Sequence, residues 1–312
     1  MAGPVPWREA WDAALYGSGG FYRSAGRPAA HFRTSGHASP LFAAAMLRMV
    51  RGAGLKAVVD AGAGGGEVLR ALARLDPDLR LCGVDLGPRP ADLPAQVGWR
   101  DTVPETDGLI LANEWLDNVT CEVVEVTAEG PRLVLVDPAT GAESLGPPPA
   151  PADAAWLDRW WPLVEEGQRA EVGRTRDEAW AAATGRLTRG LAVAVDYAHS
   201  IGTRPFGGTL TGYRQGRQVA PVPDGSCDIT AHVALDACAA AAPGLLTTQR
   251  AALRALGVSG DRPARELAIA DPPAYLRGLQ AAGEAAELTD PAGLGSFGWL
   301  VCAVGVPMPE FS

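Results

Sequence analysis

Three polar side chains directly after an apolar run have the types and the spacing for chemistry. The segment ANEWLDN, residues 112–118, carries Asn113, Glu114 and Asp117, and it follows the apolar run 108–111. Two carboxylates at this spacing can hold a guanidinium through paired, charge-assisted hydrogen bonds and fix the direction of its nitrogen lone pair. The alternative is structural, with Asn113 and Asp117 capping a turn and Glu114 in solvent.

A glycine-rich turn is the strongest local signal in the sequence. The segment VVDAGAGGGEVLRAL places Asp60, Gly62, Gly64 and Gly66 between an apolar run and a helical pattern. Glycines there let backbone amides approach a ligand, and the start of the helix favours an anionic group. A dinucleotide-binding pattern would need a third glycine where Glu67 stands, and that carboxylate would repel a pyrophosphate. Asp60 suits instead a cationic group, such as the amino group of S-adenosylmethionine (SAM); a tight turn without a ligand is the alternative.

A second acid, Asp85, lies 25 positions after Asp60, at the end of the next predicted strand. A carboxylate there can accept hydrogen bonds from both ribose hydroxyls of an adenosine. Together with the glycine turn it predicts a class I SAM-dependent methyltransferase, in which groups after the fourth strand face the methyl. Methyl transfer is an in-line displacement, so the enzyme must align the acceptor and hold or remove its proton. We therefore expect Asn113 near the methyl, with Glu114 and Asp117 orienting the acceptor.

A further polar cluster lies in SCDITAHV, residues 226–233, which contains Asp228, Thr230 and His232. Asp-x-Thr is typical of the start of a helix, with Asp228 or Thr230 as N-cap. An imidazole titrates near neutral pH, so His232 could accept a proton late in the reaction. The alternative is that His232 is a structural residue of that helix.

Alternating strands and helices must position these residues. Apolar runs predict buried strands at 57–60, 81–85, 108–112, 191–195 and 298–304, with a weaker strand near 97, and helical patterns cover 40–50 and 67–75. Such alternation is typical of an α/β fold with a doubly wound, mostly parallel, Rossmann-like sheet. Between these elements the sequence predicts a hairpin from 121–126 and 132–136, two helices over 153–189, and a long loop over 201–227.

The whole chain, 1–312, is predicted to form one methyltransferase domain. An N-terminal segment and helix, 1–52, would pack on the core. The hairpin and helical insertion occupies 118–190, and a loop-rich region on the substrate side occupies 198–245.

Composition limits the partners. The 312 residues carry a formal net charge of -9 with a pI near 5.0, which gives no global attraction for nucleic acid. No apolar run reaches the ~20 residues that cross a bilayer, and the first residues lack the apolar stretch of a signal peptide. The five cysteines are scattered without a CxxC pair, so neither a zinc site nor a disulfide framework is expected. We expect a cytoplasmic protein without a metal, membrane or nucleic-acid partner, and the oligomeric state stays open.

Several segments, in order, resemble the MidA family of SAM-dependent methyltransferases, which includes a mitochondrial complex I assembly factor that methylates protein arginine. The resemblance spans nearly the whole chain. The matching segments are Phe32-x-Thr34 with Ser39 and Phe42, the glycine turn, Val84-Asp85, Ala112 to Asp117, Val195-Asp196-Tyr197, Asp228 to Val233, and Thr248-Gln249 with Leu256-Gly257.

The resemblance implies a Rossmann-like methyltransferase core with an inserted hairpin and helical elements on the substrate side. It implies SAM as the cofactor, arginine on a protein as the acceptor, and a cofactor-binding set of Asp60, Gly62, Gly64, Gly66, Asp85 and Thr34. Asn-Glu-Trp-Leu is also similar to the Glu-Trp loop that grips the guanidinium in other arginine methyltransferases. The second glutamate of that loop falls here on Val123, so Glu122, Glu125 or Asp117 would have to replace it.

Some family positions differ in this chain. Two acids of the family's N-terminal signature are His31 and His37 here, and the residues after Asp117 also depart from the pattern. The cofactor half of the pattern is retained, while the substrate half is partly rewritten. Two alternatives for the function therefore stay open: a SAM-binding assembly or scaffold protein with little catalysis, and a small-molecule N- or O-methyltransferase.

Overall fold

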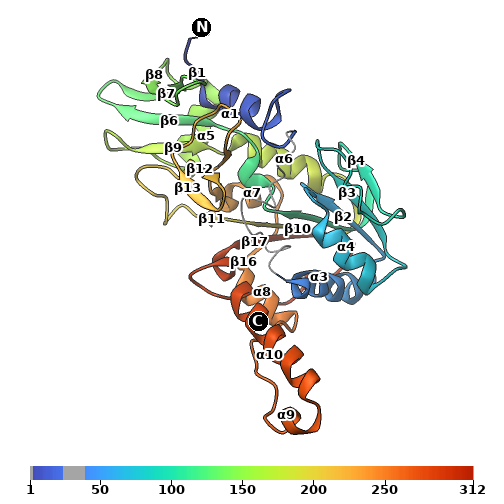
Figure 1. The fold of residues 1–312 in the computed structure, drawn as a ribbon. Coiled ribbons are helices and arrows are strands. Elements are labelled where there is room, and N and C mark those ends of the chain that lie inside the picture. Colours follow the sequence, from blue (N-terminus) through green and yellow to red (C-terminus); the bar gives the residue numbers. More distant parts are fainter. Residues whose placement is uncertain (1–2, 24–38, 312) are drawn as a thin grey trace.

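A seven-stranded sheet forms the centre of the protein. The computed structural model describes residues 3–23 and 39–311. The strands follow the order β16-β17-β10-β5-β2-β3-β4 across the sheet (Figure 1). Their bounds are β2 (Ala57–Ala61), β3 (Arg80–Val84), β4 (Gly98–Arg100), β5 (Thr106–Asn113), β10 (Leu187–Asp196), β16 (Leu245–Thr248) and β17 (Gly298–Val304).

The order of the strands creates a switch point in the middle of the sheet. The strands from β4 to β10 pair in parallel, whereas β17 pairs antiparallel with both β10 and β16. The chain moves outward from β2 to β3 and β4 and then returns to β5, on the other side of β2. Such a reversal leaves a crevice at the carboxyl ends of the strands, where ligands bind. The predicted α/β fold with a Rossmann-like, mostly parallel sheet is confirmed.

Helices cover both faces of this sheet. On one face lie α3 (Pro40–Gly52), α4 (Glu67–Leu75) and α8 (Gln249–Ala255), and on the other lie α6 (Arg174–Thr184) and α7 (Leu235–Ala241). Successive residues of a strand point to opposite faces. Accordingly, Leu109 of β5 packs in one core with Met46 and Leu69, while Ile110 packs in the other core with Trp180. The sheet is therefore buried on both sides, which explains its continuous apolar runs.

A second sheet is built from the predicted hairpin. Its strands are β1 (Val5–Pro6), β6 (Glu122–Thr127), β7 (Gly130–Val136), β8 (Glu143–Leu145) and β9 (Arg169–Val172). Helix α1 (Trp7–Tyr16) packs against the hairpin through Trp7 and Trp11. The two helices predicted over 153–189 are α5 (Pro151–Trp160) and α6. The prediction missed β9 between them, because a strand of four residues is too short to show a period.

The predicted loop over 201–227 contains short strands. Between β10 and α7 the chain forms β11 (Ala198–His199), β12 (Thr211–Arg214), β13 (Arg217–Val219), β14 (Asp228–Thr230) and β15 (Val233–Ala234). The prediction that a helix starts at Asp228 or Thr230 is wrong, because these residues pair antiparallel with β12. Helix α7 begins later, at Leu235. Pairing within a sheet has therefore overridden a local capping signal.

A helical arm projects from the end of the body that carries α8 (Figure 1). The arm, residues 259–288, consists of α9 (Leu267–Ala270) and α10 (Pro272–Leu288) with the segment that precedes them. No residue from 259 to 281 is buried. Within the described ranges, none of the helices combines the length and the apolarity needed to cross a membrane.

Candidate functional site

A pocket of about 750 Å³ opens at the carboxyl ends of β2, β3 and β5. Small-molecule sites typically have volumes of ~300–1,000 Å³. Six of the predicted site residues line it, namely Asp60, Gly62, Gly64, Asp85, Asn113 and Glu114. Gly66 is the N-cap of α4, directly after the lining residues of the turn. Thr34 lies outside the described residues.

The glycine turn joins β2 to α4 through backbone angles that side chains rarely adopt. The φ angle is 73° at Gly62 and 50° at Gly64, both in the left-handed region. A Cβ on Gly62 would come within 2.7 Å of the Trp115 ring. The amides of Gly64 and Gly87 donate to the two carboxylate oxygens of Asp85, at 2.8 and 2.7 Å. Asp85 therefore ties the glycine turn to the loop after β3.

Asp60 is an acid held among other acids at the end of β2. It is 4% exposed. Burial and the charges of Glu67 and Asp85 raise the pKa of its carboxyl to about 8. Glu67, at the first turn of α4, also pairs with Arg70 at 3.0 Å. A cationic ligand placed here would offset the repulsion and favour the ionised form of Asp60.

Glu114 follows β5 in a backbone conformation that is rare for a residue with a side chain. Its φ angle is 53°, and such strain costs about 1–3 kcal/mol and recurs at functional sites. Its amide donates to the carbonyl of Val195 on β10 at 2.8 Å, and its carboxylate accepts from Asn113 Nδ2 at 3.2 Å. Asn113 Oδ1 is buried and has no hydrogen-bond partner among the described residues. The pocket thus presents a carboxylate and an amide oxygen side by side, which can accept from an N–H donor.

The sequence of the chain identifies its protein family. A family model described as "Putative S-adenosyl-L-methionine-dependent methyltransferase" matches residues 67–251, which is more than half of the chain. The chain belongs to this methyltransferase family. A comparison with curated proteins found no match.

Two solved structures from Burkholderia thailandensis are similar to this methyltransferase over nearly its whole length. One is a COG1565 superfamily member bound to S-adenosyl-homocysteine, with 27% identity, a TM-score of 0.80, and coverage of 98% of this chain and 89% of that chain. The other is a native crystal structure of an uncharacterized COG1565 superfamily protein, with 27% identity, a TM-score of 0.76, and coverage of 98% and 88%. The COG1565 superfamily includes MidA, so the resemblance to the MidA family is confirmed.

The pocket of the methyltransferase fits SAM, the cofactor of its family. When bound, SAM supplies a methyl group on a positively charged sulfur. We expect Asp60 to hold the amino group of SAM. Burial and two neighbouring acids raise the pKa of Asp60, and no positive charge of the protein acts against them, so a bound ammonium could supply that charge. We expect Asp85 to hold the ribose hydroxyls, because it lies at the carboxyl end of β3 and lines the pocket.

The affinity of the methyltransferase for SAM should rise with pH. The free enzyme holds Asp60 mostly protonated below its pKa of about 8, whereas the bound ammonium requires the ionised carboxylate. Binding below this pKa therefore releases a proton, and the association constant should rise by up to about tenfold per pH unit towards pH 8. At higher pH it should fall again, because the amino group of free SAM loses the proton that the bound ammonium needs. Calorimetry in buffers of different ionisation enthalpy measures the released proton. Proton release that persists in Asp60→Asn would contradict this assignment.

Asp196 fixes the turn that carries Glu114. It ends β10 and is fully buried. One carboxylate oxygen accepts from the amides of Leu116 and Asp117 at 3.0 and 3.2 Å, and the other accepts from the amide of Tyr197 at 3.0 Å. These amides begin the short helix η2 (Leu116–Asn118), so the acid caps it from the neighbouring strand. The methyltransferase thus holds its Glu114 turn from both β5 and β10.

Asp117 supports this turn and does not line the pocket. It is 6% exposed, and its Oδ2 accepts from the Thr230 hydroxyl at 2.8 Å. Its carbonyl accepts from the buried Arg176 at 2.8 Å. Burial raises the pKa of Asp117, and Thr230 and Arg176 act in the opposite direction. Glu114 and Asn113 therefore line the pocket, whereas Asp117 lies behind it, and the predicted role of Asp117 in orienting the acceptor stays a prediction.

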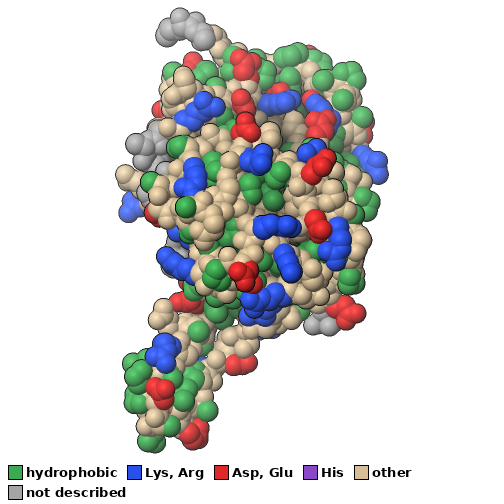
Figure 2. All heavy atoms as spheres, turned by 90° about the vertical axis from the view of Figure 1, so that its right-hand side faces the viewer, with side chains coloured by type: hydrophobic (Ala, Val, Ile, Leu, Met, Phe, Trp, Pro, Cys, Tyr) green, Lys and Arg blue, Asp and Glu red, His purple; other side chains and the backbone are tan. Residues whose placement is uncertain are grey.

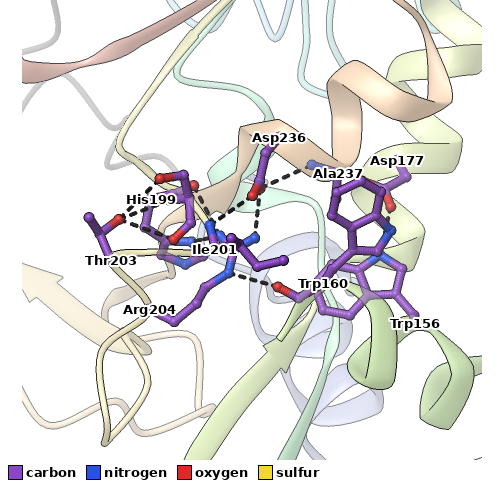
Figure 3. Close-up of polar contacts among 10 residues, drawn as sticks. Trp156, Trp160, Asp177, His199, Ile201, Thr203, Arg204, Asp236 and Ala237 are labelled. Atoms are coloured by element: carbon purple, nitrogen blue, oxygen red, sulfur yellow. Dashed lines mark hydrogen bonds and ion pairs between the residues drawn. The ribbon is translucent and has the colours of Figure 1, made fainter. Parts of the chain in front are cut away.

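His232 is exposed and, like Asp117, does not line the pocket. It lies near a polar cluster of His199, Arg204 and Asp236. Its ring stacks on Tyr197, with 5.4 Å between the centroids, and the ring of His199 lies 6.5 Å away. His199 contacts Arg204, which pairs with Asp236 at 2.6 Å and fixes the loop after β11 (Figure 3). His232 lies between β14 and β15, so its interpretation as a helix residue is wrong. Its role as a late proton acceptor stays a prediction.

Sequence reasoning missed three aromatic residues that line the pocket of the methyltransferase, namely Tyr16, Tyr22 and Trp115. The two tyrosine rings are stacked 5.7 Å apart. The Tyr16 hydroxyl donates to the carbonyl of Asn118 and the Tyr22 hydroxyl to its Oδ1, both at 2.9 Å. Trp115 had a signal, because it lies inside ANEWLDN beside Glu114. The tyrosines had none, because their contacts join the N-terminal segment to a residue about 100 positions later.

Proposed function

We propose that this methyltransferase transfers the methyl group of SAM to a side-chain nitrogen of a protein, with arginine as the acceptor. The observation that carries the proposal is the strained Glu114, which lies beside the unpartnered Asn113 Oδ1 in the pocket that contains the glycine turn. A planar guanidinium carries five N–H donors and matches two neighbouring acceptor atoms. The resemblance to the MidA family supports a protein as the bearer of this group.

The charges around the pocket also favour a cationic acceptor. Acids outnumber bases among its lining residues: the acids are Asp60, Glu67, Asp85, Asp92, Asp101 and Glu114, and the bases are Arg70 and Arg186. A cleft lined by one sign of charge raises the local concentration of ligands of the opposite sign. A guanidinium is attracted to such a pocket, whereas a phosphate or carboxylate acceptor is repelled.

The residues of the pocket account for the alignment that methyl transfer requires. Glu114 and Asn113 can hold two N–H groups of the guanidinium and direct the lone pair of one nitrogen towards the methyl carbon. As the new N–C bond forms, the bond between sulfur and carbon breaks and the nitrogen loses one proton. Glu114 can hold that proton before it passes to solvent. The strain at Glu114 is maintained by the Val195 carbonyl and by Asp196, so this geometry exists before the acceptor binds.

The test is methyl transfer to proteins of a cell extract from a strain that lacks this chain. Purified protein is incubated with the extract and with SAM that is labelled on its methyl group. We expect label in a small number of protein bands, and acid hydrolysis of those bands should release labelled methylarginine. The Glu114→Gln variant serves as the control for transfer by other enzymes of the extract.

The same experiment separates the alternatives. Label in the low-mass fraction would indicate a small-molecule methyltransferase. Binding of SAM without any transfer would indicate a scaffold. Label on lysine or on a carboxylate would contradict arginine as the acceptor and would still support a protein acceptor.

The cytoplasmic location expected from the sequence is part of the proposal and is supported by five cysteines that form no disulfide.

A further inference from the structure

Tyr197 and His232, which we call the aromatic pair, present an exposed ring at the end of β10. Tyr197 follows β10 directly, and its ring packs on the buried Phe297 with 4.1 Å between the centroids. The ring of His232 stacks on Tyr197, with 5.4 Å between the centroids and 19° between the planes. Tyr197 is half-buried and His232 is exposed. Among the described residues, the hydrogen bonds of His232 come from its main chain alone.

The main chain of His232 is fixed on both sides of its exposed ring. Its amide donates to the Thr209 hydroxyl at 2.9 Å, and its carbonyl accepts from Arg176 at 2.8 Å. Arg176 is 1% exposed and also donates to the carbonyl of Asp117 at 2.8 Å, so one buried side chain joins His232 to η2. The ring therefore has a fixed position before any ligand binds, which lowers the entropic cost of binding.

The aromatic pair adjoins the part of the site that an acceptor approaches. Asp85 and Asp60 lie at the ends of β3 and β2, Glu114 follows β5, and the next strand of the sheet is β10. An in-line displacement places the acceptor nitrogen on the far side of the methyl group from the sulfur. With the cofactor at Asp60 and Asp85, the acceptor extends from Glu114 towards β10. Burial raises the pKa of the Tyr197 hydroxyl, and Glu114 contributes most among the charges that raise it further.

The side of the molecule that carries β3, β4 and α4 has the mixed surface of a solvated face. Figure 2 shows this side, on which acidic and basic side chains are interspersed. Neither sign of charge gathers there to attract an acceptor. The aromatic pair lies instead at the end of β10 and directly before β15, where it offers an acceptor chain two uncharged rings near Glu114.

We propose, given the protein acceptor proposed above, that the aromatic pair binds the main chain of the acceptor protein beside its target side chain. A neutral imidazole carries one donor and one acceptor nitrogen, which match the C=O and N–H of a peptide group. Burial and the charge of Arg176 lower the pKa of His232, so its ring is neutral at neutral pH. Free arginine has an ammonium and a carboxylate in place of these peptide groups. The aromatic pair therefore favours arginine within a protein over the free amino acid.

Steady-state methyl transfer to the proteins of the deletion-strain extract tests this role. The probe is the protein fraction of the extract in a dilution series, with labelled SAM at saturation. His232→Ala should raise the apparent KM for extract protein by roughly tenfold, the effect of losing one hydrogen bond and one ring contact. Its kcat and its affinity for SAM should match those of the wild type, because His232 does not line the pocket.

Two further variants complete the series. His232→Phe keeps a ring on Tyr197 and removes the hydrogen bonds, so its KM should lie between those of the wild type and His232→Ala. Phe206→Ala is the matched control, because Phe206 is 54% exposed in the same loop-rich region and does not line the pocket. This control should keep the KM of the wild type. Circular dichroism verifies the fold of each variant.

Three results would overturn the role of the aromatic pair. An unchanged KM in His232→Ala shows that the acceptor chain lies elsewhere. A loss of kcat at unchanged KM shows that His232 takes part in proton transfer instead of binding. An equal rise of KM in Phe206→Ala shows general contact with the surface. If the wild type itself labels no protein, the proposed protein acceptor fails as well.

Discussion

Replacement of Asp85 by alanine is expected to weaken SAM binding by roughly 10- to 100-fold, the effect of losing one hydrogen bond to a charged group. The variant removes the proposed acceptor for the ribose hydroxyls. It also releases the amides of Gly64 and Gly87, which the carboxylate joins at 2.8 and 2.7 Å. Isothermal titration calorimetry at pH 8 measures the affinity, and circular dichroism with thermal unfolding verifies the fold.

The matched control for Asp85 is Asp107→Ala. Asp107 is a carboxylate near the amino end of β5, on the edge of the sheet opposite the pocket. Its side chain is 56% exposed and pairs with Arg189 at 3.3 Å. Its removal should leave the affinity for SAM unchanged. Wild-type affinity in a folded Asp85→Ala variant would show that the pocket binds the cofactor through other residues.

Replacement of Glu114 by glutamine is expected to reduce kcat/KM for the acceptor by roughly 10²–10³-fold while SAM binds almost as in the wild type. Glutamine has the same shape and keeps the hydrogen bond to Asn113, but it carries no charge. The variant therefore loses the paired, charge-assisted contact with a guanidinium and the group that can take the proton. Steady-state methyl transfer to the acceptor found in the extract measures the first effect, and calorimetry measures the second.

Glu129→Gln is the control for this charge removal. Glu129 is a 79% exposed residue of the hairpin that pairs with Arg132, so its removal should change neither parameter. Full activity in Glu114→Gln would exclude Glu114 as the acceptor-binding carboxylate. Equal losses in SAM affinity and in turnover would indicate instead that the substitution disrupts the pocket as a whole.

The central sheet was predictable because its strands are buried on both faces and read as continuous apolar runs. All five predicted strands and the weaker strand near residue 97 correspond to strands of the sheet. Short strands outside the sheet were not predictable from local pattern. The sequence of Asp228–Thr230 predicts a helix start, because its capping residues look the same whether or not β12 pairs with them.

The part of the site that follows strand ends was predictable, since parallel strands bring their carboxyl ends to one edge. Asp60, Asp85 and Glu114 were found in this way, and all three line the pocket. The sequence pairs Asp117 with Glu114 as the second carboxylate for a guanidinium, but Asp117 does not line the pocket. The chain turns through η2 after Trp115, so the Asp117 side chain points to Thr230 instead. Asp196 acts through amides on another strand, and no spacing in the sequence reveals that.

The two tyrosines from the N-terminal segment have a consequence for how the enzyme is made and handled. Tyr22 contacts Asn118 and Asp228 of β14, so residues from the beginning of the chain and from its last third lie together at this side of the pocket. During synthesis this wall can form only after residue 228 has left the ribosome. Proteolytic removal of the residues up to Tyr22, or an affinity tag that displaces α1, would remove these tyrosines from the pocket and expose it to solvent on that side. Purification through the C-terminus is therefore the safer choice for every measurement described above.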